Sequence, residues 1–158
     1  MTRNRHSPHP RSAASASDVA RSRAHTHAQE HRVLPAALTA YTAFRERHYE
    51  PYLQYAALRI GRDQAAEKAV TAAFIELAVS WTAILGSAGP AAVAWTILHD
   101  HVERALGHSA ATGQGLQALH HDASLLHEQM HLSRDRTAEV LGIDPADIPI
   151  LLSRPTEG

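Results

Sequence analysis

The stretch AAEKAVTAAFIELAVSW at residues 65–81 decides the fold class. Its apolar residues recur at alternating steps of three and one, which places them along one face of an α-helix. The stripe consists of Ala66, Ala69, Val70, Ala73, Phe74, Leu77, Ala78 and Trp81. This pattern predicts an amphipathic helix whose apolar face packs into a core.

The opposite face of this helix is mostly polar, with Glu67, Lys68, Thr71 and Glu76. It also carries two apolar residues, Ile75 and Val79. Exposed apolar residues at these positions indicate either a surface for a partner or the scattered exposure that is normal on soluble proteins.

Helical patterns continue on both sides. Residues 34–49 and 51–60 have apolar residues at three- and four-residue spacings, and Pro51 predicts either a break or the first turn of a second helix. Gly61 predicts the end of that helix, and Pro90 the first turn of another over residues 91–106. The inner face predicted for this last helix contains Ala94, Ile97, Leu98, Val102 and Ala105.

A linker rich in small residues at 107–115 leads to a second, smaller unit. After a helical pattern over residues 116–131, Ser133 predicts the cap of a helix that stops before Gly142, and Asp144 with Pro145 predicts another helix start. Two short helices joined by a tight turn predict a helix-turn-helix. Since no strand pattern occurs, we expect an all-α fold: a helical bundle over residues 33–106 and a helix-turn-helix unit over residues 116–158.

Residues 1–32 have a different composition. They contain six Arg against Asp18 and Glu30, whereas the acidic residues exceed the basic ones by five in the rest of the chain. This segment has no aromatic residue and no apolar period, which predicts a disordered basic tail. Such a tail either follows phosphates or simply keeps a protein soluble.

Composition excludes several classes of protein. The 158 residues include no cysteine, so disulfides, thiolate zinc sites and cysteine nucleophiles are ruled out. The sequence has no run of 18 apolar residues and no apolar signal segment near Met1. We therefore expect a soluble cytoplasmic protein that does not associate with membranes.

The sequence His127-Glu128-Gln129-Met130-His131 matches a zinc-protease motif, in which two histidines on one helix face bind zinc and the glutamate is the general base. With 13 His in the chain, however, chance produces such a string readily. No third ligand and no strand for a substrate accompany it. We predict no catalysis, no cofactor and no metal, with His127 and His131 as the remote metal-binding alternative; the pairs His99/His101 and His120/His121 are interpreted as surface histidines.

A larger resemblance extends over much of the chain. Residues 44–60 (FRERHYEPYLQYAALRI), 65–81 and 90–102 (PAAVAWTILHDHV) resemble, in order and spacing, region 2 of extracytoplasmic-function RNA polymerase sigma factors. Residues 132–154 (LSRDRTAEVLGIDPADIPILLSR) resemble a truncated form of the helix-turn-helix of region 4. The most specific elements are TAEVLGI at 137–143 and the pattern of Ala66-Glu67, Val70 and Phe74.

The resemblance implies a transcription initiation factor that catalyses no reaction. Its partners would be core RNA polymerase, promoter DNA and an anti-sigma or other regulatory protein. The residues implied in polymerase binding are Glu67, Lys68, Val70, Thr71, Phe74 and Ile75. Those implied in DNA binding are Trp95, Thr96, His99 and His101 at the −10 element, with Ser153 and Arg154 in the helix-turn-helix.

The chain departs from the family pattern at both expected contact surfaces. In the polymerase-binding helix, Lys68 and Thr71 replace an Asp and a Gln. In the helix expected to bind DNA, Asp100 and neutral histidines stand where the family has Arg, which should weaken binding to phosphates. Pro149, Ile150 and Leu151 occupy the helix that would enter the major groove, and they lack donors for base contacts.

The alternative is a sigma-like scaffold that no longer binds DNA and regulates through protein contacts, with Ile75, Val79, Ile150 and Leu151 as contact residues. Trp95 likewise has two interpretations, because it could stack on an unpaired base, yet Leu98 and Val102 follow it at the helical intervals of a core residue. His99 and His101 would bind phosphate better when protonated.

Overall fold

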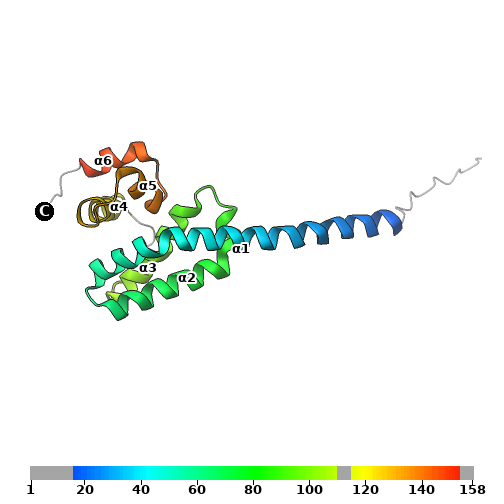
Figure 1. The fold of residues 1–158 in the computed structure, drawn as a ribbon, viewed down its shortest axis with the longest axis horizontal. Coiled ribbons are helices and arrows are strands. Elements are labelled where there is room, and N and C mark those ends of the chain that lie inside the picture. The colour runs from blue at the N-terminus through cyan, green and yellow to red at the C-terminus, as the bar shows by residue number, and fades with distance from the viewer. Residues whose placement is uncertain (1–15, 110–114, 154–158) are drawn as a thin grey trace, which may run out of the picture. The chain divides into compact units, whose positions relative to one another are not determined.

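The computed structural model describes residues 16–109 and 115–153, and Figure 1 shows that these residues are helical, with turns and short loops between the helices. No strand occurs in these described ranges, so the predicted all-α class is confirmed for them. Contacts divide the chain into a unit of residues 1–36 and a unit of residues 37–158. Every side-chain contact discussed below, apart from one ion pair near Asp18, lies in the second unit.

Helix α1 extends without interruption over Ala16–Ile60, so the break expected at Pro51 is wrong. A proline inside a helix removes the donor that would bond the carbonyl four residues earlier. In this structure that carbonyl belongs to Arg47, and the Arg136 guanidinium donates a hydrogen bond to it. The helix therefore tolerates Pro51 because a distant side chain replaces the missing N–H.

The first unit contains the start of α1, and here the structure differs from the expected tail. We predict disorder over residues 1–32, but the helix begins at Ala16. Its described side chains at residues 17–25 are all exposed, and Arg21 pairs with Asp18 at 3.6 Å. The segment from 16 to 34 contains no Gly or Pro and is rich in Ala and Arg, which favour helix without tertiary packing. The prediction for residues 1–15 falls outside the described residues.

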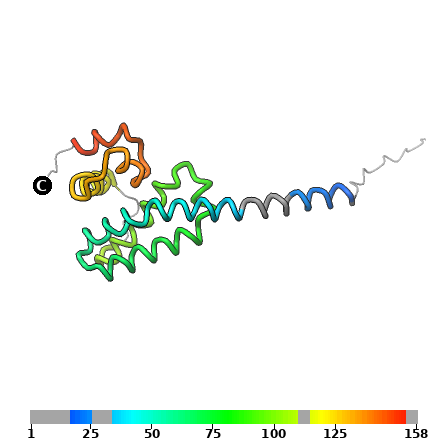
Figure 2. The backbone as a smooth tube through the Cα atoms, viewed as in Figure 1, coloured from blue at the N-terminus to red at the C-terminus, as the bar shows by residue number. Residues whose placement is uncertain are grey.

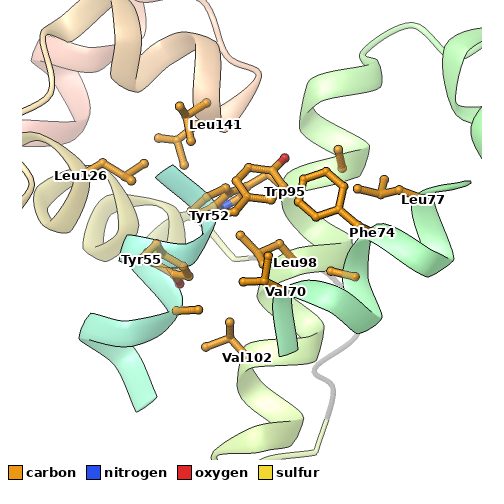
Figure 3. Packing of buried hydrophobic residues seen from close by; sticks show 14 of the residues in the cluster. Tyr52, Tyr55, Val70, Phe74, Leu77, Trp95, Leu98, Val102, Leu126 and Leu141 are labelled. Atoms are coloured by element: carbon orange, nitrogen blue, oxygen red, sulfur yellow. The ribbon is translucent and has the colours of Figure 1, made fainter. Parts of the chain in front are cut away.

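Helices α2 (Asp63–Leu85) and α3 (Pro90–Ala105) pack with residues 37–60 of α1 around an aromatic-rich core, shown in Figure 3. The predicted stripe of α2 is buried almost completely; its buried residues are Ala66, Ala69, Val70, Ala73, Phe74, Leu77, Trp81 and Ile84. Ala78 and Ala105, which the pattern assigns to inner faces, are exposed. Both are small and lie at the edges of their stripes.

Helix α2 is the one described helix that is long and apolar enough to cross a membrane, with a mean hydropathy of 1.5. Its buried stripe packs into the core of the second unit. Buried core helices of soluble proteins can have the same length and hydropathy. The packing of α2 against α1 and α3 therefore accounts for its apolarity.

The C-terminal part consists of short helices, visible at the yellow-to-red end of the tube in Figure 2. They are α4 (Leu116–Ser124), the π-helical turn η1 (Leu125–Gln129), α5 (Arg134–Leu141), the 3-10 turn η2 (Pro145–Asp147) and α6 (Ile148–Leu152). The helix predicted to start at Asp144 is thus split in two.

Three local signals in this part are confirmed. The Ser133 side chain accepts a hydrogen bond from the Arg136 backbone N–H at 3.1 Å, and the Asp144 side chain accepts one from the Ala146 N–H at 2.9 Å. Gly142 ends α5 with a left-handed φ of 72°. These caps fix the ends of the short helices.

Candidate functional site

The outer face of α2 is the part of the predicted site that remains accessible. We define it by the side chains that point away from the core: Lys68, Thr71, Ile75, Val79 and Thr82. Ile75 is 61% exposed and Val79 is 84% exposed, and they are one helical turn apart. Glu67 is exposed beside this face. An apolar centre with polar residues around it is typical of a protein-contact surface.

Two residues of the predicted polymerase-binding set do not belong to this surface. Val70 is fully buried and Phe74 is 4% exposed, so their direct contact with a partner is excluded in this structure. The Phe74 ring packs on Tyr52, with 5.5 Å between ring centroids, and the Tyr41 hydroxyl donates to the Phe74 carbonyl at 3.2 Å. The motif pattern and the core stripe coincide here, because both occupy the apolar face of the helix.

The residues of α3 predicted to contact the −10 strand are buried or form hydrogen bonds within the protein. Trp95 is 1% exposed, which excludes stacking on a DNA base and confirms the core interpretation. Thr96 donates to the Ala92 carbonyl at 3.0 Å, and the His101 Nε2 lies 2.6 Å from Glu76 Oε2. His99 belongs to the buried cluster described next, so neither histidine is a free surface residue.

A buried polar cluster joins α1, α3 and α4 around Asp122, whose side chain is fully buried. The Tyr55 hydroxyl donates to Oδ1 at 2.6 Å, and the Trp95 indole N–H donates to Oδ2 at 3.1 Å. His99 Nδ1 lies 3.2 Å from Oδ2, and Arg59 Nη1 lies 3.7 Å from Oδ1. A buried carboxylate requires such partners, because burying it alone is very costly.

The cluster continues to a second carboxylate on α3. The Arg59 guanidinium pairs with Glu103 and also donates to the Tyr55 hydroxyl at 2.7 Å. His108 Nδ1 lies 2.6 Å from Glu103 Oε2. Burial and the neighbouring Asp122 raise the pKa of Tyr55, so its hydroxyl stays a donor.

Sequence reasoning missed this cluster. Two signals for it existed: Tyr55 with Arg59, and His99 with Glu103, are pairs at i, i+4 on predicted helices. Asp122 gave no signal, since only the packing of α4 on α1 and α3 makes it buried.

Helix α5 packs against α1 and α3. Arg47 on α1 donates two hydrogen bonds to the Glu139 carboxylate, at 2.6 and 2.8 Å. Together with Arg136, they lower the pKa of Glu139 to about 2. At the turn, a Cβ built on Gly142 would lie 2.1 Å from the Ala92 backbone nitrogen, so the two backbones are in direct contact.

The segment predicted to enter the major groove has few groups that could do so. Ile148 and Leu151 lie on the buried side of α6, which excludes Leu151 as an open contact residue, while Ile150 is 62% exposed. The Ser153 hydroxyl donates to the Ile150 carbonyl at 3.0 Å. Arg154 lies outside the described residues. The accessible surface of α6 is therefore apolar, which does not suit base recognition.

The geometry also removes the basis of the zinc motif. Residues 125–129 form a π-helical turn, and His131 has a left-handed φ of 57°, so the spacing of four no longer places both histidines on one α-helical face. His127 Nδ1 lies 2.7 Å from the Leu132 carbonyl oxygen. Across the described ranges, no group of three or more His, Asp or Glu side chains could hold a metal ion.

His48 lies on the face of α1 next to α5 and provides a prediction for acid conditions. It is 5% exposed and stacks on Phe44 with 3.9 Å between ring centroids. Burial lowers the pKa of His48 below its ordinary value, so the unfolded chain takes up this proton first as the pH falls. The stability that it contributes is present above about pH 6.5 and is lost below it. We expect the urea concentration at the unfolding midpoint to be lower at about pH 5 than at about pH 7, and this difference to be smaller in His48→Phe. An equal difference in His48→Phe would contradict the assignment.

Comparison with known proteins returned no matching family model, no matching curated protein and no matching solved structure.

Proposed function

We propose that this chain is a sigma-like regulatory protein that binds core RNA polymerase through the outer face of α2 and does not itself read promoter DNA. The observation that carries the proposal is the exposure of Ile75 and Val79, at 61% and 84%, on a helix whose sequence resembles the clamp-binding helix of sigma factors. Its apolar side chains would lose water on contact, worth about 25 cal/mol per Å².

The second half of the proposal rests on what the DNA-binding candidates do instead. Trp95 is in the core, and His99 and His101 have carboxylate partners. Because phosphate contacts supply most affinity for nucleic acids, a body with five more acidic than basic residues after residue 32 disfavours DNA. The protein-interaction alternative is therefore favoured over promoter recognition.

Co-elution with purified core RNA polymerase tests this proposal. We expect Val79→Asp to weaken binding at least about tenfold, because a charge would then be desolvated at the centre of the contact. Lys68→Asp should tighten binding, since it restores the acid that the family carries there. Phe74→Ala is unsuitable, because Phe74 is buried and its loss would destabilise the fold.

Leu58→Asp is the matched control. Leu58 is 48% exposed on α1, a different helix from the one that carries the proposed contact, so the same chemical change at this position should leave binding intact. All variants should first show the wild-type unfolding midpoint. Equal binding by Val79→Asp and Leu58→Asp would refute the α2 contact, and no binding by the folded wild-type chain would refute the polymerase as partner.

A further inference from the structure

We propose that His99 and Asp122 form a pH-sensitive latch, which holds α4 on the bundle while His99 carries a proton and loosens α4 when the proton is lost. The latch would act on the docking of the C-terminal helices and is independent of the contact proposed for α2.

Asp122 is the side chain that connects α4 to the other helices of the cluster. Asp122 comes from α4, whereas its partners Tyr55 and Arg59 come from α1 and His99 comes from α3. Any movement of α4 away from the bundle must therefore separate the Asp122 carboxylate from all of these groups. Among the described residues, no other side chain of α4 forms an ion pair with α1 or α3.

The charge balance of the cluster depends on that proton. Glu103 and Asp122 contribute two carboxylates, and the Arg59 guanidinium, whose side chain is 15% exposed, faces both of them. When His99 is neutral, the charge of Arg59 is shared by these two anions. When His99 is protonated, it lies 3.2 Å from Asp122 and 3.8 Å from Glu103, and the buried charges balance.

The remaining charged neighbour does not replace His99. His108 lies 2.6 Å from Glu103 Oε2, but its side chain is 62% exposed, so solvent screens its charge. The Tyr55 hydroxyl, 3.3 Å from His99 Nδ1, is already bonded to Asp122. Protonation of His99 thus places an additional positive charge next to the carboxylate of α4.

The direction of the pH effect follows from the same contacts. The hydrogen bond to Asp122 raises the pKa of His99 above its ordinary value. A raised pKa means that the folded state binds this proton more tightly than the unfolded state. The stabilisation is complete below about pH 6.5 and is lost as the pH rises through the raised value.

A second set of contacts provides an internal reference. Glu139 on α5 is held by Arg47 and Arg136, and its pKa of about 2 keeps it charged throughout the neutral range. The latch therefore predicts a local change: α4 becomes looser above neutral pH, while α5 remains bound to α1.

Amide hydrogen exchange of the full chain tests the latch, with rates corrected for the intrinsic pH dependence of exchange. Between about pH 6.5 and pH 8.5 we expect exchange in residues 116–124 to rise at least about threefold, and exchange in residues 134–141 to stay constant. In His99→Gln, which is always neutral, α4 should exchange rapidly at both pH values. His121→Gln changes an exposed histidine on α4 itself and should behave as wild type.

Two results would overturn the proposal: α4 protection in the wild type that does not change with pH, or the same pH-dependent rise in His99→Gln. Should His99→Gln fail to fold, imidazole NMR titration of His99 in the wild type and in Asp122→Asn decides the matter. The latch requires a titration point above that of an exposed histidine, and a lower one in Asp122→Asn; equal titration points in the two proteins would refute it.

Discussion

Gly142→Ala is expected to destabilise the protein by about 3–5 kcal/mol, a large part of the stability of an ordinary domain. Gly142 has a φ of 72°, which costs a residue with a Cβ about 1–2 kcal/mol. The added Cβ would also lie 2.1 Å from the backbone nitrogen of Ala92 and 2.6 Å from the Ala91 carbonyl carbon. Neither backbone can move aside without separating α5 from α3.

Gly61→Ala is the matched control for this change. Gly61 has nearly the same φ, 73°, but a Cβ there would meet nothing within 4 Å. It should therefore cost only the conformational part, about 1–2 kcal/mol. Urea denaturation of both variants measures the difference between them. Equal losses of stability would mean that the turn after α5 is not in contact with α3.

Asp122→Ala is the second change with a large expected effect, a loss of about 3–5 kcal/mol. The Tyr55 hydroxyl and the Trp95 indole N–H would lose the acceptor that they share inside the core. Arg59 would lose one of its two carboxylate partners, and His99 would lose its main counter-ion. The cost is large because the groups left behind remain buried and unpaired.

Asp135→Ala tests whether any aspartate would give the same result. Asp135 lies exposed in the first turn of α5, so its loss should cost less than about 1 kcal/mol through the helix dipole. Thermal unfolding of the two variants at about neutral pH gives the comparison. A loss for Asp122→Ala as small as that for Asp135→Ala would contradict the buried cluster.

Much of the fold could be predicted because it depends on local chemistry. The stripe of α2 follows from helical periodicity, and Ser133, Gly142 and Asp144 mark helix ends through hydrogen bonds to residues nearby in sequence. These features require no knowledge of the tertiary structure.

The features that could not be predicted depend on partners distant in sequence. The helix continues through Pro51 because Arg136 donates a hydrogen bond to the Arg47 carbonyl. These two residues are 89 positions apart in the sequence. Asp122 is buried against Tyr55 and Trp95, which precede it by 67 and 27 positions in the sequence. Local patterns contain no information about these pairings.

The candidate site was predicted in part, for a physical reason. Val70 and Phe74 belong to the apolar stripe of α2, and an apolar stripe is equally typical of a core and of a binding face. The structure assigns them to the core and leaves Ile75 and Val79 on the outer face. Periodicity finds the helix, but only packing tells which of its faces is free.

Photo-crosslinking tests the central claim, the contact between the outer face of α2 and core RNA polymerase, most directly. A photoreactive amino acid would replace Val79 in the full chain, with Leu58 as the control position, and each protein would be irradiated with the purified polymerase. The proposal predicts an adduct with a polymerase subunit from position 79 and none from position 58. Absence of an adduct from position 79, or equal adducts from both positions, would contradict it.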